Sequence, residues 1–184
     1  HMKSRILKID SEYLINGLKE FDVLLVPGFQ GVNTKNQLTT LGRGGSDTSA
    51  VAVAAAINAE CIIYTDVDGV YTTDPNLVPS ARKINQISYE EMLELASQGA
   101  KVLQTRSVEL AMRKKTKLSV RSSMEPKKTG TIVTEENSTL ENNTVSGIAY
   151  SKDEAKITLS RVLDKPGVSS KIFGPLARGN INVD

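Results

Sequence analysis

The sequence predicts an α/β fold of three layers, in which helices cover both faces of a mainly parallel sheet. Two observations lead to this prediction. Short, continuous apolar runs, which are typical of buried strands, alternate along the chain with segments of helical character. Glycine-containing loops follow two of these runs, at the position where ligands bind in open α/β sheets.

The predicted strands are apolar runs bounded by turn residues, and they cover residues 23–26, 61–65, 118–123 and 130–134. The predicted helices cover residues 11–19, residues 47–58, a segment from Ser88 to near Gly99, and a further segment to about Lys115. Ser88 and Glu91 fit a capping box, in which each side chain accepts a hydrogen bond from the backbone N–H of the other residue. The polar segments 29–45 and 66–79 are expected to be loops.

A change of composition predicts a second, smaller domain. Residues 135–144 are rich in acidic and amide residues, so we expect a linker between a domain at 3–134 and one at 145–184. The second domain is expected to contain a strand or hairpin at 145–162, a turn at 164–167, a helix at 169–179 that Pro175 shortens or kinks, and a strand at 181–183. So small a core is marginal without a partner.

Composition excludes several classes of protein. The 184 residues include 23 basic and 21 acidic side chains, and aromatic residues are only 4% of the chain, so nothing favours a nucleic-acid partner. No apolar run approaches the ~20 residues that a membrane span needs. Cys61 is the single cysteine and lies in an apolar run, so we expect a buried thiol and a reducing compartment, the cytoplasm. His1-Met2 is expected to be a cloning remnant, with the natural chain starting further upstream.

The stretch LGRGGSDTSAVAVAAAINAE, residues 41–60, predicts an anion site. Its glycines allow a close backbone approach, and the helix that follows directs its free N–H groups back at the loop. Arg43 adds a fork that binds a carboxylate or phosphate, and Ser46 or Asp47 can cap the helix. The stretch matches neither the Walker A loop nor the dinucleotide fingerprint. A tight turn beside a solvated arginine is the alternative that the stretch by itself leaves open.

Two further stretches are candidates for chemistry. TDVDGVYTTDP follows a predicted strand, and a nucleotide-side loop there would hydrogen-bond through Thr65 and Asp66 and pack Tyr71 against the nucleotide. The spacing of this stretch does not fit a calcium loop, and a solvated acidic loop is the alternative. In GAKVLQTRSVE, Lys101 lies at a break between two predicted helices, where an ordinary surface lysine is the alternative.

Taken together, these stretches resemble a known family. GFQG, TTLGRGGSDTSA, TDVDGVYTTDP and GAKVLQTRSVE, in this order and spacing, are similar to the aspartate kinases of the amino acid kinase superfamily. The similarity runs from about residue 5 to the end of the chain. The tail, with SKDEAKITLSRVLDKPG and GNINVD, resembles the start of that family's regulatory ACT domain. The resemblance implies the C-terminal part of the amino acid kinase fold, followed by a partial ferredoxin-like segment.

The resemblance also implies an activity and a set of site residues. The activity is transfer of the γ-phosphate of ATP, with Mg²⁺, to the β-carboxylate of L-aspartate, the first step of lysine, threonine, methionine and diaminopimelate biosynthesis. Aspartate would be bound by Arg43, Gly44, Gly45 and Ser46, while Asp47 would orient a catalytic lysine. The nucleotide would be bound by Thr65, Asp66, Tyr71, Lys101 and Val102, and no residue is expected to be a dedicated metal ligand. Asp164 and Gly167 would help bind a lysine or threonine effector, in a homo-oligomer formed through complete ACT domains.

Two departures from the family pattern affect these expectations. The family's opening Lys-Phe-Gly-Gly motif, which carries the lysine that neutralises transition-state charge, is missing, so we expect a truncated form that is inactive by itself. Asn76 stands where the family usually has an arginine, which leaves one expected nucleotide contact open. The alternatives are another amino acid kinase, such as a glutamate 5-kinase, and a non-catalytic regulatory chain that binds an effector.

Overall fold

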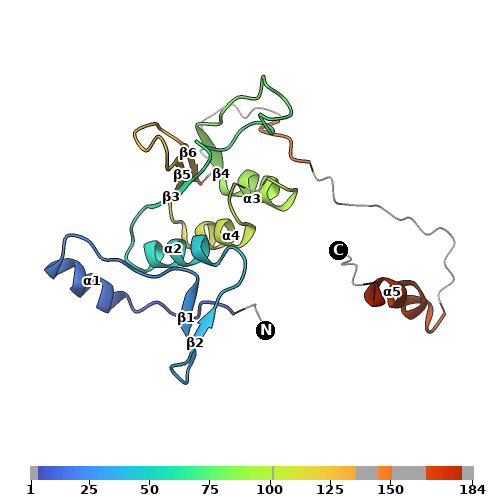
Figure 1. Ribbon diagram of the computed structural model, residues 1–184, viewed down its shortest axis with the longest axis horizontal. Helices are drawn as coiled ribbons and strands as arrows, with labels where there is room; N and C mark the ends of the chain where they lie inside the picture. The colour runs from blue at the N-terminus through green and yellow to red at the C-terminus, as the bar shows by residue number, and fades with distance from the viewer. Residues whose placement is uncertain (1–3, 101, 136–144, 151–164, 180–184) are drawn as a thin grey trace. The chain divides into compact units, whose positions relative to one another are not determined.

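The computed structural model describes residues 4–100, 102–135, 145–150 and 165–179. The chain forms two compact units, residues 1–151 and residues 152–184. The first unit contains, in chain order, α1 (Ser11–Glu20), β1 (Gln30–Val32), β2 (Leu38–Thr40), α2 (Gly45–Ala56), β3 (Cys61–Thr65), β4 (Gln86–Ser88), α3 (Tyr89–Ser97), α4 (Thr105–Lys114), β5 (Leu118–Ser122) and β6 (Thr131–Thr134) (Figure 1). The second contains α5 (Val168–Arg178).

The main sheet has four strands in the order β3-β5-β6-β4. β3 pairs with β5 in parallel, as β4 does with β6, whereas β5 and β6 are antiparallel. The parallel pair β3–β5 places Cys61 beside Leu118 and Thr65 beside Ser122. This mixed, mainly parallel sheet with its helices confirms the predicted α/β class.

Helices α2, α3 and α4 pack against one face of this sheet (Figure 1). The core between them is made of small and medium apolar side chains, among them Val51, Met92, Val108, Leu118 and Val133, all of which are fully buried. On the opposite face of β3, Ile62 and Tyr64 are 38% and 51% exposed. Alternate residues of β3 therefore face the core and the surface, as the two-residue period of a strand requires.

The predicted capping box at the start of α3 is confirmed. The backbone N–H of Glu91 donates to Ser88 Oγ at 3.1 Å, and the backbone N–H of Ser88 donates to Glu91 Oε2 at 3.0 Å. Both partners lie three residues apart, so the motif is determined locally. The same helix begins with the buried Tyr89, whose hydroxyl donates to the carbonyl oxygen of Thr116 at 2.9 Å.

Two predictions near the N-terminus are wrong. Residues 23–26 form no strand, and Val23 and Leu25 are 80% and 98% exposed. A strand needs a neighbour to accept its backbone hydrogen bonds, and no neighbouring strand lies beside this segment in the described part of the chain. Conversely, the predicted loop 29–45 contains the hairpin β1–β2, whose turn is held by backbone N–H groups that donate to Asn33 Oδ1.

Several outcomes concern the chain after β6. Residues 145–150, part of the predicted hairpin, adopt no strand, and the backbone N–H of Ile148 donates to the carbonyl oxygen of Thr72 at 2.7 Å. The rest of that hairpin and the predicted strand 181–183 lie outside the described residues. In the second unit α5 continues past Pro175 to Arg178, so the proline does not end the helix. The boundaries proposed for the two domains stay predictions.

Candidate functional site

The glycine-rich loop before α2 turns through two left-handed glycines. Gly42 has φ of 78° and Gly44 has φ of 71°, a region that side chains beyond glycine rarely adopt. Gly44 is the N-cap of α2, and its carbonyl oxygen accepts from the backbone N–H and the hydroxyl of Thr48. The expectation that Ser46 or Asp47 caps the helix is therefore wrong, because the left-handed turn at Gly44 starts the helix before either residue.

Close packing is a second reason for glycine in this loop. A Cβ on Gly44 would lie 2.6 Å from Cγ of Gln104, the N-cap residue of α4. A Cβ on Gly45 would lie 2.8 Å from Cβ of Leu41 and 3.0 Å from the ring of Phe29. The loop is consequently held against both the start of α4 and the segment that leads into β1.

Asp47 lies where the amino ends of two helices meet. It is in the first turn of α2, it is half-buried, and its carboxylate accepts a hydrogen bond from the backbone N–H of Gln104 at the start of α4. Burial raises the pKa of Asp47 above its ordinary value, and the hydrogen bond from Gln104 only partly opposes this effect. The positive ends of α2 and α4 thus converge on one carboxylate, which is where an anion is favoured.

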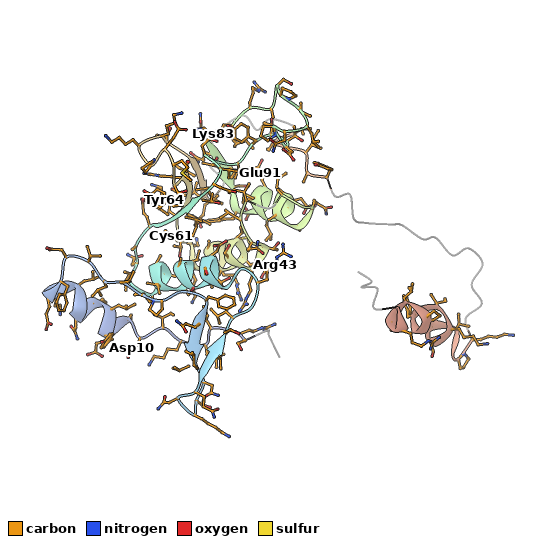
Figure 2. All side chains as sticks on the ribbon, in the orientation of Figure 1. Asp10, Arg43, Cys61, Tyr64, Lys83 and Glu91 are labelled. Carbon is orange, nitrogen blue, oxygen red and sulfur yellow. The ribbon has the colours of Figure 1, made fainter. Side chains whose placement is uncertain are left out.

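Arg43 and Ser46 stand on the exposed side of this loop. Figure 2 shows Arg43 beside the end at which α2 begins. Its guanidinium makes no ion pair with any residue in the described part of the chain. A planar, unpaired guanidinium next to free helix N–H groups can bind a carboxylate through two parallel hydrogen bonds.

The acidic loop begins at the carboxyl end of β3. The hydroxyl of Thr65 donates to Asp66 Oδ1 at 3.0 Å, and Asp66 is exposed. Ser123, which follows β5, donates to the carbonyl oxygen of Thr65 from both its backbone N–H, at 2.8 Å, and its hydroxyl, at 3.0 Å. The loops that follow the two parallel strands are therefore joined at the edge of the sheet where ligands commonly bind.

Tyr71 is held in place by a charged pair. Its hydroxyl donates to Asp68 Oδ1 at 3.0 Å, while Lys83 Nζ lies 3.3 Å from Asp68 Oδ2 and donates to the carbonyl oxygen of Thr129 at 2.9 Å. Burial works against ionisation of Asp68, but the hydrogen bonds from Tyr71 and Lys83, with the charge of Lys83, outweigh it and lower the pKa of Asp68. The hydrogen bond to Asp68 raises the pKa of Tyr71, so the phenol stays protonated.

A buried threonine in the sheet forms hydrogen bonds with the loop that carries Tyr71. Thr131, in β6, is fully buried, and its hydroxyl accepts from the backbone N–H of Val70 at 2.8 Å and donates to the carbonyl oxygen of Ile84 at 2.6 Å. The loop that carries Tyr71 is thereby fixed to the sheet by side-chain hydrogen bonds between residues far apart in the sequence.

Asp47 acts electrostatically on the amino end of β3. Its charge contributes to the raised pKa of Cys61, the first residue of β3, whereas Thr65 is the last residue of that strand. α2 and β3 are consecutive, are joined by residues 57–60 and contribute to the same core.

The structure gives fewer contacts for the other residues of the predicted sites. Val102 is half-buried and packs against the core just before α4, whereas Lys101 lies outside the described residues. Asn76 is exposed, and its backbone N–H donates to Asp74 Oδ1 at 2.9 Å. Gly167 is the left-handed N-cap of α5, with φ of 88°, and Asp164 lies outside the described residues.

Sequence reasoning missed several residues of this site. Gln104 contributes a backbone N–H to Asp47. Tyr71 is held by Asp68 and Lys83, and the ends of its loop are fixed by Ser123 and Thr131. Asp68 lies inside the acidic loop TDVDGVYTTDP, so its role beside Tyr71 could have been predicted from the sequence. Nothing in the sequence distinguishes Lys83 or Thr131 from other lysines and threonines. Within the described residues, no three His, Cys, Asp or Glu side chains cluster as metal ligands would.

Comparison with known proteins identifies the family. The amino acid kinase family matches residues 1–122, about two thirds of the chain. The chain belongs to the amino acid kinase family. Among curated members of this amino acid kinase family, the chain is 54% identical over 186 residues to the aspartate kinase of Pseudomonas putida strain KT2440. That match covers all of the chain but 45% of the relative, so the chain spans about half the length of the curated protein it matches.

Solved structures of amino acid kinases agree with this assignment. The chain is similar to Escherichia coli aspartokinase III, solved with aspartate and ADP in the R-state, with a TM-score of 0.70 and 34% identity. It is also similar to the same enzyme solved with lysine and aspartate in the T-state, with a TM-score of 0.71 and 33% identity. Each match covers 95% of the chain and 39% of the solved chain, and the predicted fold family is therefore confirmed.

Proposed function

We propose that the chain is the nucleotide-binding, C-terminal part of an aspartate kinase, which transfers the γ-phosphate of ATP to the β-carboxylate of L-aspartate and gives 4-phospho-L-aspartate. The observation that carries this proposal is the convergence of two helix amino ends on Asp47 beside the unpaired Arg43. The 54% identity to an aspartate kinase supports the choice of substrate. This reaction begins the synthesis of lysine, threonine and methionine.

On the acceptor side, we assign Arg43 to an aspartate carboxylate. Gly44 and Ser46 contribute backbone N–H groups, and Ser46 adds its exposed hydroxyl. Gly45, whose N–H donates to the carbonyl oxygen of Gly42 at 2.9 Å, lines the same pocket without donating to the substrate. Asp47 is held by Gln104 and is oriented to position a cationic group, which the resemblance identifies as a lysine outside this chain. The E. coli aspartokinase III structures contain aspartate, which is consistent with this assignment.

On the donor side, we assign ATP to the loop after β3. Thr65 and Asp66 offer a hydroxyl and a carboxylate at the strand end, and Tyr71 offers a ring whose position is fixed by Asp68. We assign Lys101 and Val102 to the ATP site as well. Mg²⁺ is expected to accompany ATP, and it is held mainly by phosphate oxygens, water and one or two carboxylates. Mg²⁺ would neutralise phosphate charge, and no residue of this chain is assigned to it as a dedicated ligand.

Phosphoryl transfer depends mainly on positioning and charge neutralisation, so it requires cations and N–H donors rather than a strong nucleophile. The residues of this chain bind and orient the two substrates. The lysine that would neutralise transition-state charge is not among them, and removal of one such group typically lowers the rate by ~10²–10³. We therefore expect this chain to bind substrates but not to turn them over.

Regulation, assembly and location are further parts of the proposal. One E. coli aspartokinase III structure contains lysine, and we propose lysine or threonine as the effector of the complete protein, near Gly167 and Asp164. A homo-oligomer formed through complete ACT domains would create that effector site. No helix in the described ranges is long and apolar enough to cross a membrane, and we propose the cytoplasm as the location.

Calorimetric titration of the chain with MgATP tests the donor side. We expect weak, saturable binding that weakens further in Tyr71→Ala and Lys101→Ala. Tyr13→Ala is a matched control, because Tyr13 is 77% exposed on α1, far along the chain from the loop. Absence of binding at millimolar MgATP, or equal weakening in the control, would contradict the nucleotide assignment.

A further inference from the structure

A cavity of about 930 Å³ lies in the first unit, apart from the loop after β3. Its walls come from three segments: residues 5–9 before α1, the α2 region and α4. The cavity is of the size that binds small molecules, and it is larger than one phosphate ion needs.

The lining of this cavity has a strong excess of positive charge. It contains six cationic side chains and one acidic side chain, Glu109, and the cations are Arg5, Lys8, Arg43, Arg106, Arg113 and Lys114. The whole chain has a net charge of only +2, so the excess of positive charge in this lining is a local feature. Arg43 also belongs to the proposed aspartate site, and the remaining five cations carry the inference by themselves.

These cations have no acidic partners in the described ranges. The ion pairs found there involve other lysines, Lys83, Lys115, Lys117 and Lys128, each with an acidic side chain 2.6 to 3.3 Å away. Like charges gathered around one cavity raise its potential and concentrate anions in it. An anionic ligand would therefore relieve repulsion that the protein itself leaves uncompensated.

One of the arginines is fixed and shapes the cavity. Arg106, in α4, is half-buried, and its guanidinium donates to the carbonyl oxygens of Leu41 at 2.8 Å and Ser4 at 2.5 Å. It thus ties the segment before α1 and the loop before α2 to α4. The other cations on these walls, Arg5, Lys8, Arg113 and Lys114, are exposed and can turn toward a ligand.

The residue types indicate which anion is bound. Arginine forks match phosphate oxygens in two parallel hydrogen bonds, and without Arg43 the cavity still presents arginines from two segments, Arg5 before α1 and Arg106 and Arg113 in α4. Five cations around one space exceed what a single phosphate dianion can neutralise. We infer that this cavity is a binding site for a small polyanion that carries two or more phosphate groups. The inference does not depend on the proposed kinase activity.

The test is calorimetry of the 184-residue chain with inorganic tripolyphosphate at constant ionic strength. We expect saturable 1:1 binding that weakens at least tenfold in Arg113→Ala/Lys114→Ala. Because both residues also favour the last turn of α4 through the helix dipole, the pair Arg5→Ala/Lys8→Ala on the non-helical wall provides an independent variant with the same expected loss. The control is Lys35→Ala/Lys127→Ala, which removes two positive charges outside the cavity and should stay within twofold.

Four results would overturn the inference. No saturable binding at millimolar tripolyphosphate excludes the site, and equal weakening in the control pair shows a general charge effect. Loss of binding in Lys101→Ala, with both cavity variants unchanged, places the polyphosphate at the proposed nucleotide loop instead. Citrate, a tricarboxylate, distinguishes the chemistry: we expect it to bind at least tenfold more weakly than tripolyphosphate, and equal affinity would contradict a phosphate site.

Discussion

Replacement of Thr131 by valine should loosen the loop that carries Tyr71. Threonine and valine have nearly the same shape, so the substitution leaves the volume of this fully buried position almost unchanged. It removes the acceptor of the Val70 N–H and the donor to the Ile84 carbonyl oxygen. Each buried polar group left without a partner costs about 1–3 kcal/mol, and the extra buried methyl group returns about 0.8 kcal/mol. We expect a net loss of about 3 kcal/mol in the free energy of unfolding.

Thr131→Ser is the matched control, because serine keeps the hydroxyl and loses only the methyl group. Its expected cost is about 1 kcal/mol, from lost burial and a small cavity. If hydrogen bonding dominates at this position, valine is therefore the more destabilising substitution although it is the better apolar filler. If apolar packing dominates, the order is reversed.

Urea unfolding followed by tyrosine fluorescence measures this difference. The chain has no tryptophan, and all five tyrosines, at positions 13, 64, 71, 89 and 150, lie in the first unit, so the fluorescence reports on that unit alone. We also expect MgATP affinity to fall more in Thr131→Val than in Thr131→Ser. A valine variant as stable as the parent, or more stable than the serine variant, would refute the argument.

Four further predictions concern single residues. In a longer form that spans the full length of the curated relatives, Arg43→Lys should raise KM for aspartate at least tenfold more than KM for ATP, because lysine loses the planar fork; steady-state kinetics with equal effects would exclude the carboxylate role. Cys61, whose pKa is raised to about 11 by burial and by the charge of Asp47, should resist alkylation at pH 8 until the chain unfolds, which mass spectrometry can follow. The pKa of Asp68 is lower in the folded chain than in the unfolded chain, so its contribution to stability is present above the ordinary aspartate range and lost as pH falls through the folded value. Asp68→Asn should accordingly cost up to about 1 kcal/mol at pH 7 in urea unfolding, and the difference should vanish in acid. Ser88→Ala should cost about 1 kcal/mol through loss of the N-cap, and a neutral effect would show that the capping box at α3 is not stabilising.

The sequence predicts features whose partners lie close together along the chain. The capping box of α3 depends on two residues three positions apart, and the strand at 61–65 shows as an apolar run with β-branched residues. The glycine loop before α2 was also predictable as a turn that leads into a helix, since glycines, an arginine and a helix start follow one another directly. Its cap was not, because the left-handed turn at Gly44 depends on close packing against Gln104.

Features that depend on distant partners were not predictable from local pattern. Residues 23–26 have the composition of a buried strand, yet strand formation depends on a neighbour that no local pattern reveals. The polar hairpin β1–β2 lacks an apolar run and so gives no strand pattern. Thr131 forms a hydrogen bond with Val70, 61 positions away, and Lys83 forms one with Asp68, 15 positions away. Their contribution to the site becomes apparent only when the fold brings them together.

The most direct test of the proposed function is formation of an acyl phosphate, trapped with hydroxylamine, in the longer form of the protein. With ATP and Mg²⁺ we predict aspartyl hydroxamate from L-aspartate, at least a hundredfold less product from L-glutamate, and none above background from the 184-residue chain by itself. A preference for L-glutamate, no acyl phosphate from the longer form, or turnover by this chain alone would contradict the account.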